Sequence, residues 1–483
     1  MTAGARASEV DAVVVGGGPN GLAAAIEIAR EGLAVALFEA APTVGGGSRS
    51  AELTLPGFVH DVCSSIHTFG RTSPFFAAAH LEARGLRWID PPAALAHPLD
   101  DGTAVMVRGG VERTAVGFGH AADAEAYRRL FDPLVDDWES LLPDLLAPFH
   151  VPLSPRRAIR LARFGLNGIR SATSVARRFQ GDRARALLAG VAAHSILGLT
   201  EPISAAAGMV LLAGAHADGW PFPEGGAGRV PEVMADELRD LGGMIVVDHR
   251  VDSFEQLPTH RVALFDTAPR TLAAIAGDRL PAGYRSRLER FRHGAAVYKL
   301  DLAIDGSIPW AAADVAEAGT VHLGGTFEEI ARSEGLIARG RVPDRPFVLL
   351  TQTSQFDRSR APEGRNTVWA YCHVPNGSSA DMTEAILRQI ERFAPGFRER
   401  ILASVATGPA QLEAYNANNI GGDIAGGRFD LAQLFTRPTR RFIDPYATPN
   451  ASIFIGSAST PPGGGVHGMS GYHAARSVLR RLG

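Results

Sequence analysis

Cysteine and lysine are both scarce in this chain of 483 residues. The 2 cysteines, Cys63 and Cys372, are too few for a disulfide framework and fit a reducing compartment, so we expect a cytoplasmic protein. Of the 48 basic residues only Lys299 is lysine, and the others are arginine. A GC-rich coding sequence accounts for the arginine bias as a whole. The one lysine that is retained nevertheless indicates a functional position.

Long apolar runs and a strong net charge are missing as well. The longest apolar stretches, such as residues 205–217, are broken by glycine and histidine and are too short to cross a bilayer. The opening residues, MTAGARASEV, lack the apolar core of a signal peptide. A net charge of -3 gives no global field, so we expect no nucleic-acid partner. The spacing of His, Cys and Asp predicts no metal site.

A β-α-β unit opens the chain. Residues 11–16 (DAVVVG) form a short apolar run that is typical of a buried parallel strand. Residues 20–32 repeat apolar side chains on one helical face, and residues 33–38 form a second apolar run that ends before Glu39. This order and length are those of a mononucleotide-binding half.

The chain then leaves this unit and returns to it twice, with helix and strand patterns near 225–270 and 450–483. Because 483 residues exceed one ordinary core, we predict two domains and an α/β fold class, α+β overall. The dinucleotide domain is Rossmann-like and discontinuous, and the substrate domain has a mixed sheet and helices. Their predicted segments are 8–75, 220–292 and 441–483 for the first domain, and 76–219 and 293–440 for the second.

The first glycine turn carries the phosphate-binding pattern. Residues 16–21 read G-x-G-x-x-G between a strand and a helix. Gly16 permits the tight turn, Gly18 allows the backbone to approach a pyrophosphate, and Gly21 allows close packing of helix on strand. The helix N-terminus offers unpaired N–H groups to the phosphates. Glu39 follows Gly21 by 18 residues and is placed to accept from ribose hydroxyls.

Two further glycine-rich stretches favour FAD over NAD. Residues 44–49 (VGGGSR) follow the ribose-binding acid directly, and Arg49 could neutralise phosphate charge. Near the C-terminus, the apolar run 452–456 leads into STPPGGGVHGMSG and then a helix. Such a turn brings backbone N–H groups and a helix dipole against the N1/O2 edge of a flavin, where negative charge develops on reduction.

At this point the chain resembles the phytoene desaturase-like flavoproteins of the amine oxidase superfamily. The stretches that carry the resemblance run from end to end of the chain: DAVVVGGGPNGLAAAIEIAREG, LTLPGFVHDVCSSIH, YKLDLAIDGSIPW, WAYCHVPNG, IERFAPGF, YNANNIGGDIAGG and STPPGGGVHGMSGYHAA. The wider superfamily often has Gly-Asp where this chain has Gly456-Ser457, which weakens one expected cofactor contact.

The resemblance implies a non-covalent FAD, a nucleotide domain of glutathione-reductase type and a substrate domain over the flavin. We expect cofactor contacts at the following positions: Gly16, Gly18, Pro19, Asn20, Gly21, Glu39, Ala40, Gly45, Gly46, Arg49, Val251, Gly456, Ser457, Gly465, Val466, His467 and Met469. No second strand–G-x-G-x-x-G–helix pattern is present, so we expect no built-in NAD(P)H domain.

Lys299 and His467 are the candidate catalytic residues. Lys299 lies in a strand pattern, YKLDLAI, and the resemblance implies a lysine that holds a water near flavin N5. The alternative is a surface lysine on an edge strand. His467 lies inside the C-terminal flavin motif and could take a proton as hydride leaves a carbon. The stretch 415–423 (YNANNIGGD) matches a wall of the active site, or is simply a turn.

Residues 156–185 form a basic, helical stretch with 9 arginines and one acid, Asp182. Interleaved apolar residues give it the profile of a helix on an anionic membrane face. The alternatives are a solvated face of the substrate domain and a contact in a homo-oligomer.

The leading functional hypothesis is an FAD-dependent oxidoreductase that transfers hydride between flavin and an apolar, polyene- or isoprenoid-like small molecule. Its electron acceptor would be O2 or a quinone. Desaturation, saturation and isomerisation stay open, because the motifs do not separate them. Two alternatives remain: a flavin amine oxidase that uses O2, and an FAD-binding regulatory or scaffold protein without turnover.

Overall fold

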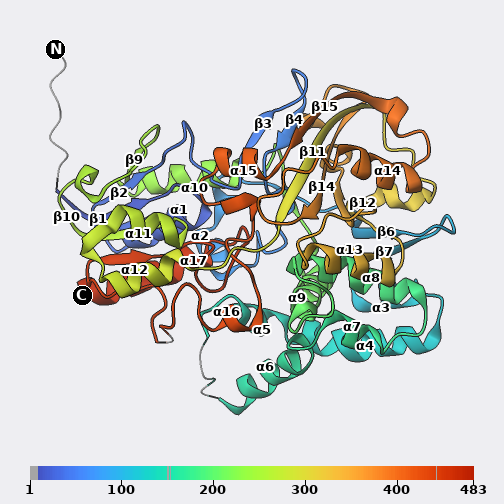
Figure 1. Cartoon of the computed structure of the whole chain (residues 1–483), viewed down its shortest axis with the longest axis horizontal. Coiled ribbons are helices and arrows are strands. Elements are labelled where there is room, and N and C mark those ends of the chain that lie inside the picture. Colours follow the sequence, from blue (N-terminus) through green and yellow to red (C-terminus); the bar gives the residue numbers. More distant parts are fainter. Residues whose placement is uncertain (1–8, 150–151, 153, 442) are drawn as a thin grey trace.

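The computed structural model describes residues 9–149, 152, 154–441 and 443–483. Two sheets dominate the molecule (Figure 1), a parallel one with helices on both faces and a mixed one with a layer of helices below it. Within the described residues, no helix is both long and apolar enough to cross a membrane.

The parallel sheet has the strand order β16-β10-β1-β2-β9. Neighbouring strands all pair in parallel. Whereas β9 at the edge is partly exposed, the central residues of β1, β2, β10 and β16 are buried on both faces. This explains the continuous apolar runs that predicted them. The strands come from three separate parts of the chain: β1 (Val10–Val15) and β2 (Val35–Phe38), β9 (Met244–Val246) and β10 (His260–Phe265), and β16 (Ile453–Ile455).

Helices cover both faces of this sheet. Three helices share one apolar cluster with one face of the strands: α1 (Pro19–Arg30), α10 (Arg229–Asp240) and α17 (Met469–Leu482). The other face packs against α11 (Pro269–Ala276) and α12 (Ala282–Glu289). The predicted Rossmann-like α/β arrangement is confirmed. The domain limits given above stay a prediction.

The mixed sheet has the order β15-β11-β14-β13-β12-β6-β7 and is antiparallel except between β12 and β6. One face packs on α14 (Thr383–Phe393), and the other faces α8 (Asp182–Ala192) and α13 (Phe327–Ile337). Its strands are β6 (Ala93–Pro98), β7 (Ala104–Val107), β11 (Ala296–Asp305), β12 (Ala318–Leu323), β13 (Val348–Thr351), β14 (Arg365–Val374) and β15 (Ile401–Thr407).

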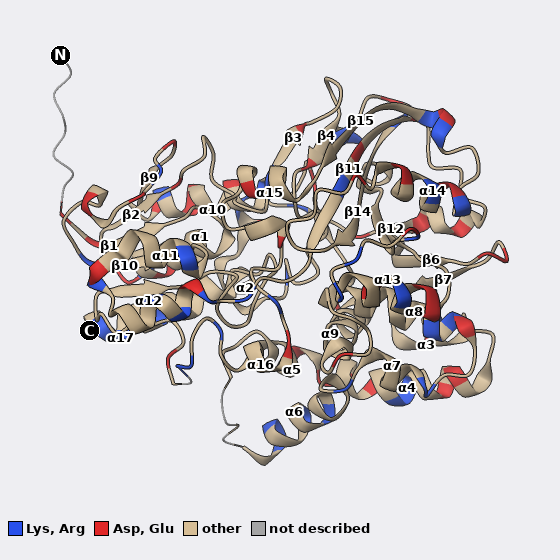
Figure 2. Cartoon of the chain, viewed as in Figure 1, with Lys and Arg blue, Asp and Glu red and all other residues tan. Residues whose placement is uncertain are grey.

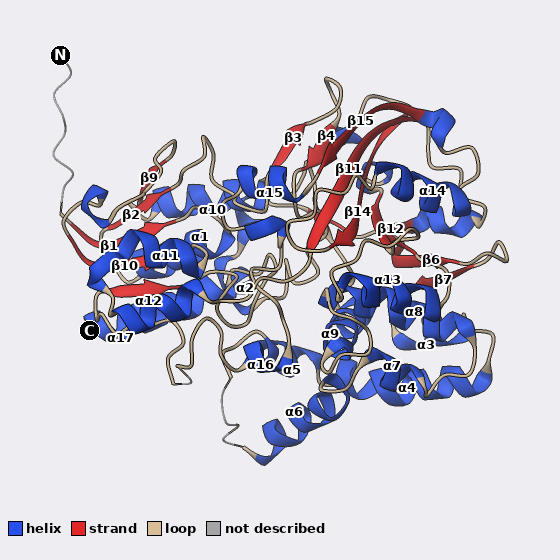
Figure 3. Cartoon of the chain, in the orientation of Figure 1, coloured by secondary structure: helices blue, strands red, loops and turns tan. Residues whose placement is uncertain are grey.

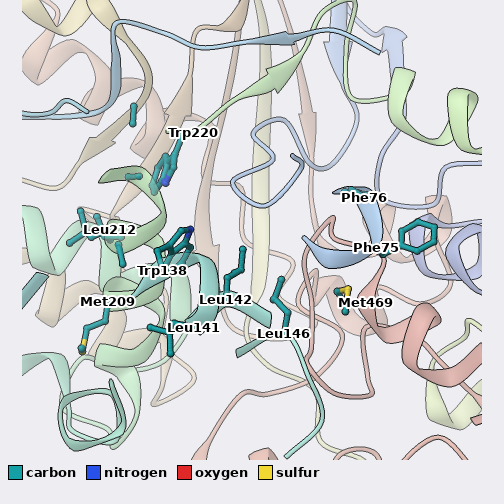
Figure 4. Packing of buried hydrophobic residues seen from close by; sticks show 14 of the residues in the cluster. Phe75, Phe76, Trp138, Leu141, Leu142, Leu146, Met209, Leu212, Trp220 and Met469 are labelled. Carbon is teal, nitrogen blue, oxygen red and sulfur yellow. The ribbon is translucent and has the colours of Figure 1, made fainter. Parts of the chain in front are cut away.

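The helical layer lies below the mixed sheet (Figure 3) and holds a large part of the apolar core. Figure 4 shows Trp138 and Leu142 packing beside Met209 and Leu212. The remaining helices are α2 (Pro74–Ala79), α3 (Val111–Val116), α4 (Ala121–Asp136), α5 (Trp138–Leu145), α6 (Pro155–Gly168), α7 (Ala172–Ala176), α9 (Ser204–Ala217), α15 (Pro409–Tyr415) and α16 (Leu431–Leu434).

Two short ribbons complete the fold. The first joins β3 (Ser50–Glu52) to β4 (Val59–Asp61), and the second joins β5 (Trp88–Ile89) to β8 (Phe222–Pro223). The first ribbon brings the segment after the second glycine turn to the edge of the mixed sheet, because β4 contacts β14. It therefore connects the nucleotide-binding part to the sheet that carries Lys299.

Candidate functional site

The candidate site begins where the parallel strands end. The loops after β1, β2, β10 and β16 all leave the same edge of the sheet, because parallel strands end on one side. In open α/β sheets this carboxyl edge is the place where ligands bind.

The first glycine turn requires glycine at two positions. Gly16 has φ +109°, and a Cβ there would lie 2.5 Å from the carbonyl oxygen of Asp266. A Cβ at Gly21 would lie 1.8 Å from the carbonyl oxygen of Gly16, so α1 packs against the turn as predicted. α1 starts at Pro19, and its N-cap Gly18 has no side chain to satisfy the first N–H groups. Pro19 has no N–H and the N–H of Gly21 donates to Asp266 Oδ2, so the N–H of Asn20 is the group at this helix start that is available to an anion.

Glu39 is fixed as an acceptor at the end of β2. The backbone N–H of Gly17 donates to Glu39 Oε2 at 2.8 Å, and the N–H of Ala41 donates to Oε1 at 2.8 Å. Two carboxylate oxygens held in this way keep lone pairs free for ribose hydroxyls. The backbone oxygen of Glu39 accepts from His249, which brings the segment before Val251 to the same place.

The second glycine turn lies directly against the first. A Cβ at Gly46 would be 3.0 Å from the Cα of Gly18. Arg49 donates to the carbonyls of Thr43 and Val44 and lies 3.3 Å from Glu39 Oε1. Its guanidinium therefore stands at the nucleotide site, but its described contacts are to its own turn, to Glu39 and to Tyr415. The phosphate contact stays a prediction.

The C-terminal glycine turn brings a second helix N-terminus to the site. α17 begins beside α1, since a Cβ at Gly471 would lie 1.7 Å from the carbonyl oxygen of Asn20. Gly464 and Gly465 are exposed and Val466 is half-buried, so this backbone is accessible where a flavin edge would lie. Ser457 is buried, and its hydroxyl accepts from the N–H of Ser459.

The described residues fit an FAD. The two glycine turns carry no Cβ where their backbones meet. The carboxylate of Glu39 accepts through both oxygens beside them. The N-termini of α1 and α17 point to the same place. Cys63 is partly exposed although it lies deep in the protein, where burial raises the pKa of its thiol. Accessible surface at such a depth is what a ligand site requires.

Lys299 is a buried residue on an interior strand of the mixed sheet. It stands on β11, which pairs with β14 on one side and β15 on the other, so the alternative of an exposed edge lysine is wrong. Its Nζ donates to Asp301 Oδ2 at 2.5 Å, and the other oxygen of Asp301 is 3.6 Å from Nδ1 of His60. Burial raises the pKa of Asp301, although Lys299 opposes the shift.

A second buried ion pair anchors the same wall. Arg360 donates to Asp61 Oδ2 at 2.6 Å and to Asp357 at 3.1 Å. Burial alone would raise the pKa of Asp61, but the Arg360 charge and the N–H of Ala227 outweigh it, and that pKa is lowered. Sequence reasoning missed Arg360, because nothing in the sequence joins positions 299 residues apart.

His467 is placed inside the C-terminal turn as expected, but both of its ring nitrogens have backbone partners. Its Nδ1 accepts from the N–H of Met469 at 3.0 Å. The backbone of Gly463 and Gly464 favours the protonated ring and so opposes the effect of burial on its pKa. Burial lowers its pKa to about 4. These are the contacts of a histidine that shapes the turn, and its role in proton transfer stays a prediction.

The stretch 415–423 reaches both halves of the site. The Tyr415 ring lies 5.6 Å from the Arg49 guanidinium, and Asn418 accepts from the N–H of Ala268 at 2.8 Å. Two other histidines have side-chain partners: His67 contacts Ser64, which donates to the carbonyl of Gly47 in the second glycine turn, and His373 pairs with Glu334.

Asp266 is a site residue that sequence reasoning missed. It follows β10, and its Oδ2 accepts from the N–H of Gly21 at 2.8 Å. Burial raises its pKa to about 7, the Gly21 hydrogen bond opposes that shift, and Glu39 adds to it. Its position directly after an apolar strand was the available signal.

Comparisons with known proteins agree with this geometry. A family model described as NAD(P)-binding Rossmann-like domain matches residues 14–79. Pyridine nucleotide-disulfide oxidoreductase domain-containing protein 2 of Rattus norvegicus is 25% identical over 554 residues, covering 98% of this chain and 94% of that protein. One of the limonene dehydrogenase polypeptides of Castellaniella defragrans is 30% identical over 125 residues, which are 26% of this chain and 22% of that polypeptide.

Among solved structures, a putrescine oxidase mutant superposes with a TM-score of 0.63 at 16% identity, covering 98% of this chain and 99% of that one. The likeness shows a shared fold. The chain is similar to the Rattus norvegicus protein over nearly its whole length, and the predicted oxidoreductase class agrees with the names of these proteins.

Proposed function

We propose that this protein is an FAD-dependent oxidoreductase that transfers hydride between the flavin and the carbon skeleton of a small molecule. The observation that carries the proposal is the continuity of the site. The glycine-lined cradle at the parallel sheet leads through β3 and β4 to a buried lysine on the mixed sheet.

Bound FAD would supply two-electron, hydride-transfer chemistry, which amino-acid side chains lack. Glu39 would accept from the ribose hydroxyls, and the N-terminus of α1 would hold the pyrophosphate. The N-terminus of α17 would stabilise negative charge on the flavin edge, because a helix dipole is positive there.

Lys299 would provide a buried positive charge held by Asp301. A charged ammonium that keeps one partner and has further N–H donors can orient water or O2. The ring of Trp369 lies 6.0 Å from its Nζ, which limits the positions that a small molecule can take beside it.

The substrate we propose has an apolar, isoprenoid-like skeleton, and the electron acceptor is O2 or a quinone. The similarity to the limonene dehydrogenase polypeptide, over 125 residues, supports such a skeleton. Amine oxidation is the second candidate. Trp369 and Tyr371 form an edge-to-face pair with ring centres 5.1 Å apart, on the strand beside Lys299. The putrescine oxidase fold supports that reading.

The test is an absorption spectrum of the purified protein, recorded before and after anaerobic dithionite reduction and after readmission of air. Flavin bands that bleach and return would support the proposal, and the rate of return would separate O2 from a quinone or protein acceptor. Absence of flavin bands after reconstitution with FAD would refute it.

We also propose that α6 contacts an anionic membrane surface. Ile159 and Leu166 on α6, and Ile169 after it, are 55%, 67% and 54% exposed. Arginines lie along the same helix, where Figure 2 shows several basic segments. An exposed apolar face beside arginines suits an interfacial helix.

Sedimentation with vesicles of phosphatidylglycerol should retain the protein, and vesicles of phosphatidylcholine should not. Leu166→Asp should abolish the retention, whereas Val116→Asp, at a 64% exposed position on α3, should not. Equal retention of both variants would contradict the proposal.

A further inference from the structure

The mixed sheet has one apolar face and a second face, called the polar face, on which polar and apolar side chains mix. On β14, Val368, Ala370, Cys372 and Val374 point into the apolar core under α14. The alternate positions point to the other face, as the pleat requires. The buried polar and aromatic side chains that share this second face across neighbouring strands are Lys299, Asp301, Trp369, Tyr371, His373, Thr351, Thr320, His322 and His97, and the apolar Val297, Leu349 and Leu95 lie among them.

On this polar face, several buried atoms have no hydrogen-bond partner among the described residues. They include Nε2 of His373, Nε1 of Trp369 and Oγ1 of Thr320. A buried polar group without a partner costs about 1–3 kcal/mol. A protein retains such groups where they serve a ligand or ordered water.

His194 approaches this face from the helical layer. It lies in a short 3-10 turn, Ala193–Ser195, that follows α8 directly. Its Nε2 lies 2.9 Å from Nε2 of His322 on β12. His194 is partly exposed, yet burial lowers its pKa to about 3, so it borders accessible space deep in the protein. Cys63, beside the glycine turns, has the same combination of depth and exposure.

The turn that carries His194 is strained and tightly fitted. Ile196, two residues further, has φ +53°, a region that β-branched residues rarely adopt. Such strain clusters at functional positions. A Cβ at Gly190, one turn earlier on α8, would lie 2.8 Å from Nδ1 of His322. The ring of Trp220 lies 5.9 Å from the His194 ring.

A second polar pair stands next to this one. Nδ1 of His373 lies 2.8 Å from Oε2 of Glu334, which reaches the sheet from α13. The ring of Phe347 links the two pairs, with its centre 5.4 Å from that of His322 and 6.0 Å from that of His373. Tyr371 lies on the same strand, with its ring 5.5 Å from that of His373.

We infer that His194, held by His322, hydrogen-bonds a hydroxyl or amino group of the substrate, and that His373 with Glu334 completes this polar end of the site. The inference rests on the proposed oxidoreductase function and narrows its substrate class. The carbon skeleton carries a polar group and is not a plain hydrocarbon.

The chemistry of neutral imidazole selects this class. Each neutral ring has one donor and one acceptor, and a shared His–His bond can be formed with either ring as donor. Nδ1 of His194 can therefore either accept or donate, which matches a hydroxyl or a neutral amine. A carboxylate or phosphate needs a fixed positive charge, and burial keeps both histidines neutral at pH 7.

The test uses the full-length, FAD-loaded protein and two probes that differ by one hydroxyl, geraniol and 2,6-dimethylocta-2,6-diene. Binding is followed by the difference spectrum of the flavin. Geraniol should bind about tenfold more tightly, the difference that one good hydrogen bond makes. His194→Phe should remove this preference and leave hydrocarbon binding unchanged, and His194→Gln, which keeps a donor and an acceptor, should restore part of it.

His216→Gln is the matched control, because His216 is also buried but hydrogen-bonds Tyr127 at 2.7 Å in the helical layer. It should keep the preference for geraniol. Equal binding of both probes, binding of neither probe, or an unchanged preference in His194→Phe would overturn the inference.

The stability of the variants is measured beside binding, because His194→Phe leaves the buried Nε2 of His322 without its partner and should lower the unfolding temperature. His194→Gln can pair with His322 and should recover both the stability and part of the preference for geraniol. Recovery of the stability without any preference for geraniol would assign His194 a structural role and overturn the inference. A protein without flavin bands would instead refute the proposed function itself.

Discussion

Asp266→Asn tests the electrostatics of the cofactor site most directly. The Asp266 carboxyl is 8% exposed and accepts from the N–H of Gly21 at the start of α1. Asparagine keeps the size and an accepting oxygen but removes the titration. The change therefore separates the hydrogen bond from the charge.

The size of the effect follows from the pKa of Asp266, which burial raises from 3.8 to about 7. A shift of about 3 units corresponds to about 4 kcal/mol as an upper limit, at 1.36 kcal/mol per unit. The folded pKa is above the unfolded one. The stability from this group is therefore fully present below about pH 4 and is lost as the pH rises through about 7.

FAD binding should depend on pH for the same reason. The pyrophosphate would bring negative charge to the turn that Asp266 contacts, and Glu39 already contributes one such charge there. The ionised Asp266 then disfavours the cofactor. We expect the dissociation constant for FAD to rise about tenfold between pH 6 and pH 8 in the natural protein and to stay level in Asp266→Asn.

The assay is quenching of flavin fluorescence on titration of the cofactor-free protein, repeated from pH 5.5 to 8.5. Urea unfolding over the same range gives the stability of both variants. A pH dependence of equal slope in the two proteins would refute the reasoning, because another group would then carry the titration. Weaker FAD binding by Asp266→Asn at every pH would show that the carboxylate favours the cofactor.

Three further substitutions have distinct outcomes. Lys299→Met should lower the rate of flavin reduction or reoxidation about 100-fold in stopped-flow measurements, with FAD still bound, because the buried charge beside Asp301 is lost; an unchanged rate would exclude the assigned role. Glu39→Gln should weaken FAD binding about tenfold in the fluorescence titration, because one ribose acceptor becomes a donor; unchanged affinity would contradict the fit. Arg360→Met should lower the free energy of unfolding by about 3–5 kcal/mol in urea, since Asp61 would be left buried without its partner; a smaller loss would show that Asp61 finds water or another donor.

The parallel sheet and its turns could be predicted because their constraints are local. Continuous apolar runs identified β1, β2, β10 and β16, and the glycine pattern follows from backbone clashes within a few residues. The stretch 156–185, predicted to be helical, contains most of α6, all of α7 and the start of α8. In each case the spacing of residues within one segment was enough to predict the element.

The mixed sheet could be predicted only in part, since both of its faces are buried. β11 was expected, but β14 was not, because Trp369, Tyr371 and His373 interrupt the apolar alternation that marks a half-exposed strand. Contacts between residues that are far apart in the sequence could not be predicted either. Asp266 and Gly21 are 245 residues apart, and only the fold brings them together.

The two faces of β14 differ in composition, and this difference indicates why polar residues lie on one of them. One face is as apolar as any core, so the same strand shows that this sequence can fill such positions with Val, Ala and Cys. On the other face, the imidazole of His373 and the indole N–H of Trp369 remain buried with unpaired atoms, which costs stability. Apolar side chains in place of His373 and Trp369 would lower that cost. Stability alone therefore does not explain why the sequence has these two residues. Their alignment with Lys299 across the β11–β14 pair gives a reason, because it places the unpaired donors and acceptors on the surface that a substrate beside the flavin would contact.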